Sequence, residues 1–222
     1  MLVDNGVDIY HPDITLQKWD KIQIPKGHIR TAETFRKEYH LSEILDDKIL
    51  SKNLAYSLQA SDLMNLLFNR VNIDLSVGRV FYKMAIINYF SIIEGMLYGV
   101  TKKLHDFCMS NESACSYHRN CKYYIKSHKK IQMDEIVNWF CVREIINLSA
   151  EEKETLSEVK GLRNNVHIWL AEKNEFLKGE YNLTTHNRTV LVLRKCRDEL
   201  AENLREFESN RSAVCTKNIT GI

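Results

Sequence analysis

Proline is scarce in this chain: only Pro12 and Pro25 occur among its 222 residues, and none follows them. Proline interrupts helices, because it lacks a backbone N–H and its ring clashes with the preceding turn. Its absence over nearly the whole chain therefore favours long helices. We predict an all-α fold, a bundle of four to five long helices, preceded by an irregular arm at residues 1–30. One short strand is expected near residues 21–24 of the arm, where polar and apolar side chains alternate.

A large excess of charge is also missing. Thirty-one Lys and Arg nearly balance twenty-nine Asp and Glu, which leaves a formal net charge of +2. A whole-molecule field that attracts nucleic acid or anionic lipid is thereby excluded, and any contact with a polyanion must be local. The hydrophobic content of 44% is enough for one sizeable core.

The first residues have neither the basic nor the apolar region of a signal peptide, so we expect a cytoplasmic protein. The most apolar segment, residues 80–100, carries Lys83, Asn88 and Glu94. These groups would lie at several depths of a bilayer. The segment is therefore predicted to be a buried helix, and no membrane partner is expected.

Apolar residues recur at three- and four-residue spacing over most of the chain, which predicts helices. Gly95 and Gly99 should let a neighbouring helix pack closely against the most apolar one. We place a helical domain at residues 31–210, with a polar insert at about 108–130 and a C-terminal tail at 211–222. The expected helices span about 42–70, 74–107, 133–147, 149–176 and 185–210.

The helix that begins at Ser149 has a capping-box sequence, in which Ser149 and Glu152 satisfy backbone amides at the helix start. Its apolar positions form one stripe, and Arg163 and His167 lie together at the edge of that stripe. Because they are four residues apart, their Cβ atoms are expected about 5 to 6 Å apart. The stripe consists of Leu156, Val159, Leu162, Val166 and Leu170.

An imidazole beside a guanidinium suits RNA cleavage by the 2′-hydroxyl of the RNA itself. Histidine can transfer protons near neutral pH, since its unperturbed pKa is about 6.5. The planar guanidinium matches phosphate oxygens. One such histidine per chain gives a single proton-transfer group, so a two-fold dimer would supply the second. This chemistry requires no metal or other cofactor.

The run from Glu158 to His167, together with the helix that contains Glu94, resembles the HEPN domain (higher eukaryotes and prokaryotes nucleotide-binding) over about residues 71–207. The resemblance implies an all-α, dimeric, metal-independent endoribonuclease of toxin–antitoxin, anti-phage or CRISPR-linked systems. RNA would be its substrate, and a cognate antitoxin or regulatory protein would be a further partner. Arg163, Asn164 and His167 match the catalytic signature of the family.

The resemblance also implies that an acidic residue on a neighbouring helix orients the site, which makes Glu94 a candidate catalytic residue. Its alternative role is a structural bond to an arginine or a backbone amide. The chain leaves three residues between Arg163 and His167, fewer than the usual signature. A non-catalytic RNA-binding or dimerisation module therefore remains an alternative. Arg36 and His40 have the same spacing without the family context and serve as an internal control.

The insert contains two further candidate binding sites. Basic residues alternate there with tyrosines such as Tyr123, a pattern that suits single-stranded RNA, although a solvated basic loop is the common alternative. Paired cysteines and histidines form a candidate zinc site, with free thiols as the default. Cys141 and Cys196 are predicted to be inert core residues. The RNA-binding set is Arg119, Lys122, Lys126, Lys129 and Lys130, and the zinc set is His105, Cys108, Cys115, His118 and Cys121.

Overall fold

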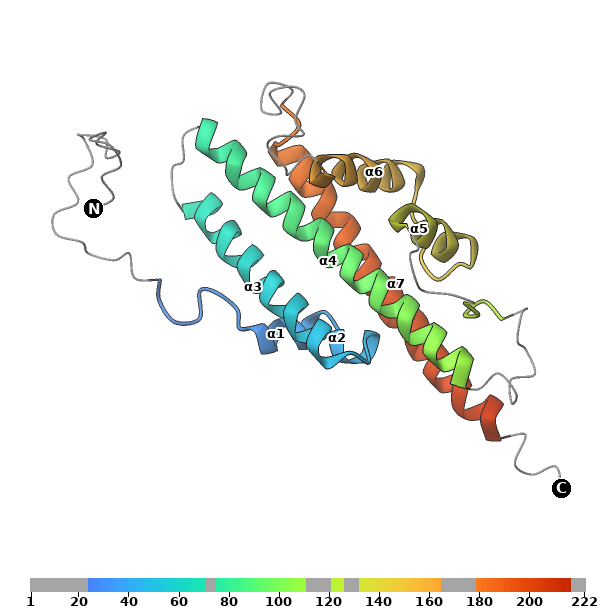
Figure 1. The fold of residues 1–222 in the computed structure, drawn as a ribbon. Coiled ribbons are helices and arrows are strands. Elements are labelled where there is room, and N and C mark those ends of the chain that lie inside the picture. The colour runs from blue at the N-terminus through green and yellow to red at the C-terminus, as the bar shows by residue number, and fades with distance from the viewer. Residues whose placement is uncertain (1–23, 71–74, 111–120, 126–131, 165–178, 217–222) are drawn as a thin grey trace, which may run out of the picture.

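The computed structural model describes residues 24–70, 75–110, 121–125, 132–164 and 179–216. Within these ranges the chain forms seven helices and no strand, which confirms the predicted all-α fold. Residues 1–23, which hold most of the predicted arm, lie outside them. The helices are α1 (Ala32–Glu38), α2 (Leu41–Ile44), α3 (Lys48–Arg70), α4 (Leu75–Ser110), α5 (Met133–Val142), α6 (Ala150–Asn164) and α7 (Leu183–Thr216), shown in Figure 1.

The helix predicted over residues 42–70 is divided into α2 and α3. The side chain of Asp47 accepts hydrogen bonds from the amides of Ile49 and Leu50, at 2.9 and 3.0 Å, and so satisfies the exposed start of α3. Apolar periodicity continues across the interruption, and for that reason the sequence pattern predicted one helix. A short helix that was not predicted, α1, precedes them and begins where Thr31 caps the amide of Thr34.

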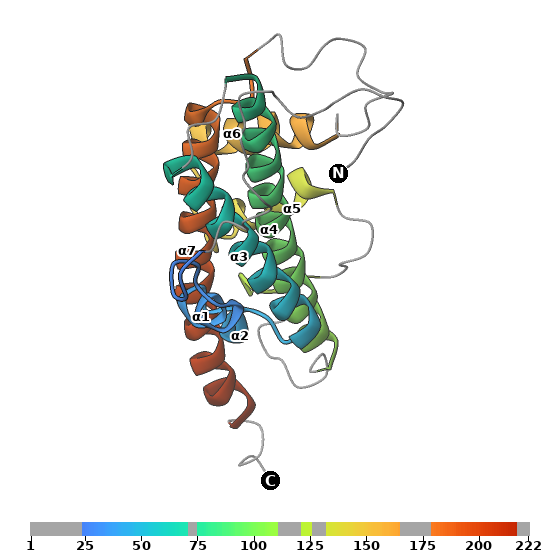
Figure 2. The same cartoon turned by 90° about the vertical axis from the view of Figure 1, so that its left-hand side faces the viewer.

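α4 and α7 are long and run parallel, side by side, in both Figure 1 and Figure 2. Near their starts, the rings of Tyr89 and His186 lie 5.5 Å apart between centroids. Near their ends, the rings of Phe107 and Phe207 lie 5.0 Å apart. α3 runs antiparallel to α4 on another side.

The close approach predicted at Gly95 and Gly99 of α4 is confirmed. A Cβ on Gly95 would lie 2.8 Å from a methyl carbon of Leu54, and a Cβ on Gly99 would lie 2.4 Å from one of Leu45. Because of this close packing, α4 is the centre of the core. Its buried residues contact those of α3, α6 and α7, among them Leu58, Ile86, Phe90, Ile93, Leu97, Val159, Leu193, Cys196 and Leu200.

The polar residues of the apolar segment have partners inside the protein. Asn88 donates to the carbonyl of Ser57 at 2.8 Å, and Lys83 lies over the ring of Tyr181. By length and composition alone, one helix among the described residues, spanning Val77–Ser110 within α4, could cross a membrane. That is weak evidence for a membrane span, because the core helix of a bundle has the same composition.

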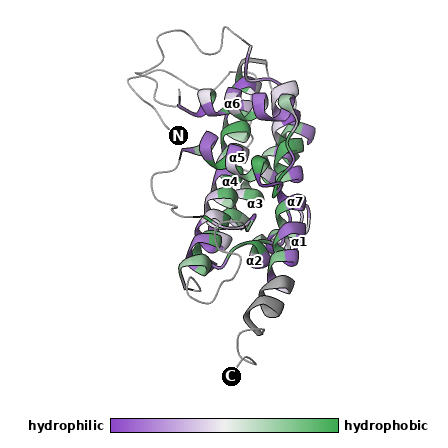
Figure 3. Ribbon diagram, turned by 90° about the vertical axis from the view of Figure 1, so that its right-hand side faces the viewer, coloured by the Kyte–Doolittle hydropathy of each residue, from purple (hydrophilic) through white to green (hydrophobic). Residues whose placement is uncertain are grey.

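α5 and α6 cover the other side of α4 (Figure 1). α5 ends at Val142, earlier than the predicted residue 147, and Glu144 has a positive φ of 55°. The predicted capping box of α6 is confirmed: Ser149 and Glu152 exchange hydrogen bonds at its start. In Figure 3, hydrophilic residues line the outer side of α6. α7 continues to Thr216, past the predicted start of the tail.

Candidate functional site

Arg163 lies in the last turn of α6, where its position follows from the packing of that helix. Leu156, Val159 and Leu162 are buried against the core and fix the rotation of α6. Arg163, one residue after Leu162, is therefore turned to the edge of the buried stripe, as predicted.

Glu94 of α4 is the partner of Arg163. The Nη2 atom of Arg163 donates to Oε2 of Glu94 at 3.1 Å, which joins α6 to the middle of α4. Both side chains keep access to solvent, with 42% of Arg163 and 33% of Glu94 exposed. The bond uses one guanidinium nitrogen, so the other N–H groups are not committed to Glu94.

The remaining predicted catalytic residues differ in what is known of their positions. Asn164 ends α6 and is exposed beside Arg163. His167, and the continuation of the helix to about residue 176, lie outside the described residues. The predicted neighbourhood of Arg163 and His167 therefore stays a prediction.

Ion pairs hold α6 against both α5 and α7. Lys160 pairs with Asp134 of α5, and Glu158 accepts from Arg188 of α7 at 3.2 Å. Burial alone would raise the pKa of Glu152, but the hydrogen bonds from Ser149 and from Lys195 of α7, with the charge of Lys195, together outweigh it and lower the pKa. Arg163 therefore lies on a helix that polar side-chain contacts join to α4, α5 and α7.

The internal control has a different local structure. Arg36 belongs to α1, which ends at Glu38, while His40 has a left-handed backbone with φ of 51° at the start of α2. Arg36 pairs with Glu33 at 3.0 Å, and His40 contacts Glu43. Equal spacing therefore does not give a shared helical face here.

Lys122 is the described member of the predicted RNA-binding set, and it is tied to α7. Its ammonium lies 2.8 Å from a carboxylate oxygen of Glu206 and 3.1 Å from the side-chain oxygen of Asn203. Burial lowers the pKa of Lys122, but the hydrogen bonds and charges of Glu206 and Tyr123 together outweigh it, and the net shift of the pKa is upward. Arg119, Lys126, Lys129 and Lys130 lie outside the described residues.

Tyr123 does not fit the predicted stacking role. Its ring is buried, with the ring of Phe207 at 5.0 Å, and its hydroxyl donates to the carbonyl of Asn203 at 3.0 Å. Burial raises its pKa to about 12. A base cannot stack on a ring already covered by the core, so Tyr123 is a packing residue.

Three members of the predicted zinc set are described, and they do not form a site by themselves. His105 contacts Asp106 at 3.1 Å, the thiol of Cys108 is directed at the carbonyl of Tyr123 at 3.8 Å, and Cys121 is half-buried. No metal-binding group of three His, Cys, Asp or Glu occurs within the described residues. Cys115 and His118 fall outside them.

The cysteines predicted to be inert are part of the core or next to it. Cys196 is fully buried, and burial raises its pKa to about 12, so the reactive thiolate is disfavoured. Cys141 is half-buried against the same core.

Two further groups of side chains were not predicted. His186 at the start of α7 is buried among the rings of Phe68, Tyr82 and Tyr89, at 5.8, 5.9 and 5.5 Å. Its Nε2 atom has no hydrogen-bond partner in the described part of the chain. No periodic signal marks such a residue, because its neighbours come from two other helices, α3 and α4.

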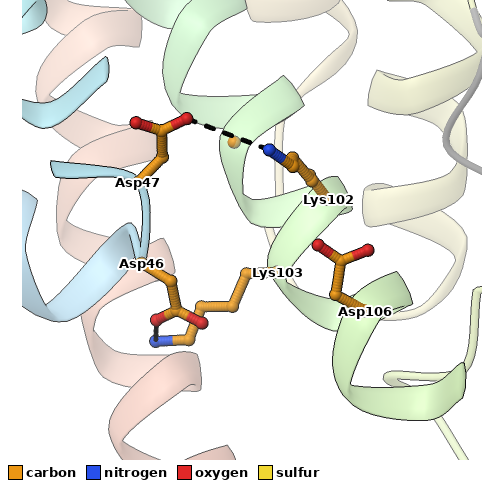
Figure 4. A pocket seen from close by; sticks show the side chains of 6 residues that line it. Asp46, Asp47, Lys102, Lys103 and Asp106 are labelled. Atoms are coloured by element: carbon orange, nitrogen blue, oxygen red, sulfur yellow. Dashed lines mark ion pairs between the residues drawn. The ribbon is translucent and has the colours of Figure 1, made fainter. Parts of the chain in front are cut away.

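The second group consists of charged residues around a cavity of about 210 Å³ beside the α2–α3 turn (Figure 4). Lys103 pairs there with Asp46 at 3.2 Å, and Lys102 lies 3.9 Å from Asp47. Paired charges of this kind join helices and provide no nucleophile. The lining residues are Asp46, Asp47, Gly99, Lys102, Lys103 and Asp106.

Comparison with known proteins identifies no relative: no family model, curated protein or solved structure matches this chain. The functional argument therefore depends on the residues themselves.

Proposed function

We propose that this protein is a metal-independent endoribonuclease of HEPN type, which cleaves RNA by attack of the 2′-hydroxyl on the adjacent phosphodiester. The observation that supports it best is the Arg163–Glu94 pair, a half-exposed guanidinium held by a carboxylate on a neighbouring helix. Such a pair fits the orienting acid that the resemblance implies. By the same resemblance, the setting is toxin–antitoxin control or anti-phage defence.

In this proposal each residue has one role. His167 accepts the 2′-hydroxyl proton or protonates the leaving oxygen, and Arg163 stabilises the charge that develops on the phosphate. Asn164 hydrogen-bonds nearby. Glu94 acts through Arg163: one bond fixes the guanidinium, which lowers the entropic cost of orienting its other N–H groups toward phosphate.

A single His167 supplies one proton-transfer group, so the proposal includes a homodimer with two copies of the site in one cleft. RNA is the substrate, and a cognate antitoxin or regulatory protein is a further expected partner. No membrane takes part.

Cleavage of RNA in EDTA tests the proposal directly. We expect the purified protein to cut RNA without divalent metal, and His167→Ala to slow cleavage about 10²- to 10⁴-fold, since general acid–base catalysis contributes that much. His40→Ala is the control and should leave the rate unchanged, because His40 lies at the start of α2. Activity that persists in His167→Ala, or that EDTA abolishes, would refute the proposal.

The same Arg163–Glu94 bond favours a second candidate, a non-catalytic RNA-binding or dimerisation module, because a paired arginine is partly neutralised. RNA binding without cleavage, unchanged by His167→Ala, would establish this alternative.

A further inference from the structure

α4 exposes one apolar face over most of its length. Met84 is 53% exposed and Tyr98 is 41% exposed, while Val77 and Val80 are also exposed and Ser91 lies between the two halves. Successive positions are three, four, seven and seven residues apart and so lie on one face of the helix, the arrangement of a helix–helix seam, with the polar Ser91 in the middle of the row. Single exposed apolar residues are normal, but an aligned row of them marks an interaction surface.

α3 and α6 both pack against α4. Glu94 is three residues after Ser91 and four before Tyr98, on the side of the stripe that faces α6, where it meets Arg163. Gly95 and Asn88 mark the opposite side, since both contact α3. The stripe and the Arg163–Glu94 pair are therefore parts of one surface.

We infer that this face of α4 docks a second copy of the chain, with the two α4 helices antiparallel about a two-fold axis at Ser91. The inference deepens the proposed function, because it supplies the second copy that the ribonuclease site requires.

The stripe is complementary to itself about Ser91. Ser91 is its smallest exposed residue, so two helices approach most closely there. Met84 and Tyr98 each lie seven residues from Ser91, so the axis brings Met84 against the partner's Tyr98, a favourable sulfur–aromatic contact. Val80 and Lys102 lie eleven residues from it, so the aliphatic stem of Lys102 covers the partner's Val80 while its ammonium stays in solvent.

The antiparallel arrangement also places the two sites together. A two-fold axis perpendicular to both helices keeps each edge of the stripe on its own side of the dimer, so both Arg163–Glu94 pairs lie along one edge. The two Glu94 positions are then about 9 Å apart along the helix axes. A parallel arrangement would put the pairs on opposite edges, where they could not share one RNA.

The stripe is too small to form a stable interface by itself. From Val77 to Tyr98 the stripe is about 31 Å long, and at a width of about 10 Å it covers about 300 Å² per copy. A stable interface needs about 800 Å² per partner. The rest must come from the helices that flank α4.

The first test is a matched pair of substitutions, with the molar mass measured by light scattering or sedimentation. We expect wild type to be a dimer, and Met84→Glu to raise its dissociation constant at least tenfold while the helical circular dichroism is unchanged. Leu191→Glu is the control: Leu191 is an exposed apolar residue of α7 and lies outside the stripe. It should therefore remain dimeric.

A second test links the two copies covalently at the axis and introduces no charge into the interface. Ser91→Cys should form a disulfide-linked dimer under mild oxidation, because the two copies of residue 91 meet at the axis, and Glu202→Cys on α7 should not exceed wild type. A monomeric wild type, or a dimer that neither Met84→Glu nor Ser91→Cys affects, refutes the interface. A Ser91-linked dimer that never cuts RNA refutes the proposed function alone, whereas His167-dependent cleavage by a dimer that neither Met84→Glu nor Ser91→Cys affects refutes the interface alone.

Discussion

At the scale of single residues, His186 makes the fold sensitive to acid. Burial lowers its pKa, with a smaller opposing effect from Asn187, because a charged imidazole would lose its hydration among three aromatic rings. Above the unfolded pKa of about 6.5, the residue is neutral in both states and has no effect. Below it, the unfolded chain binds a proton that the folded chain does not, so stability falls as the pH decreases.

We therefore predict that His186→Phe reduces the loss of stability between pH 7 and pH 5. Phenylalanine fills the same aromatic site and cannot titrate. Urea unfolding at the two pH values measures the effect, with His28→Ala, an exposed histidine, as the control. An equal loss in wild type and His186→Phe would show that other groups govern the acid response.

Residue-scale prediction from the sequence succeeded for local features and failed for contacts between distant segments. Ser149 and Glu152 were identified as a capping box because both lie in one turn. That Glu94 would meet Arg163, 69 residues away, could not be derived, because helix packing brings them together. The sequence indicated only that Glu94, a carboxylate in an apolar helix, needs a partner such as an arginine.

At the scale of elements, two glycines in helices have opposite roles. Gly99 is needed for the α2–α3 turn to approach α4, since a Cβ would meet Leu45 at 2.4 Å and Leu50 at 2.9 Å. Gly161 of α6 has open space around it. The same substitution should therefore change stability in opposite directions.

Gly99→Ala should destabilise the fold, because overpacking costs about 1–3 kcal/mol and a gain in helix propensity of up to about 1 kcal/mol offsets only part of it. Gly161→Ala should stabilise it by about 0.5–1 kcal/mol. Chemical denaturation of both variants checks this. If Gly99→Ala were as stable as Gly161→Ala, the close approach to Leu45 would not be a constraint.

Element boundaries were harder to predict than the existence of the elements. The apolar spacing found the helices that became α3, α4, α5, α6 and α7, because each buries a periodic face. It missed the break at Asp46 and Asp47, where a side-chain cap, not a change in hydrophobic pattern, ends one helix and starts the next. Caps are encoded by one or two residues, so periodicity over a long window conceals them.

At the scale of the whole molecule, Lys103 joins three segments that are far apart in sequence. From α4 its ammonium donates to the carbonyl of Glu43 at 2.9 Å and pairs with Asp46 at the α2–α3 turn. It also pairs with Glu208 of α7 at 3.1 Å. Only 5% of the Lys103 side chain is exposed, whereas its partners Asp46 and Glu208 are 71% and 41% exposed, so the stem of the lysine is buried and its ion pairs lie at the surface (Figure 4).

This arrangement predicts that Lys103→Met destabilises the whole bundle. Methionine keeps the buried stem but removes the donor, which leaves the Glu43 carbonyl without its bond and two carboxylates without their cation, at a cost of about 1–3 kcal/mol. Lys102→Met is the matched control and should change stability by less than about 0.5 kcal/mol, because its neighbour Asp47 is 3.9 Å away at an exposed position. Since α3, α4 and α7 share one core, unfolding followed by circular dichroism and by tryptophan fluorescence should shift together in Lys103→Met. Separate shifts of the two signals would mean that the region around Trp139 of α5 unfolds independently of the other helices, and that Lys103 does not stabilise the whole bundle.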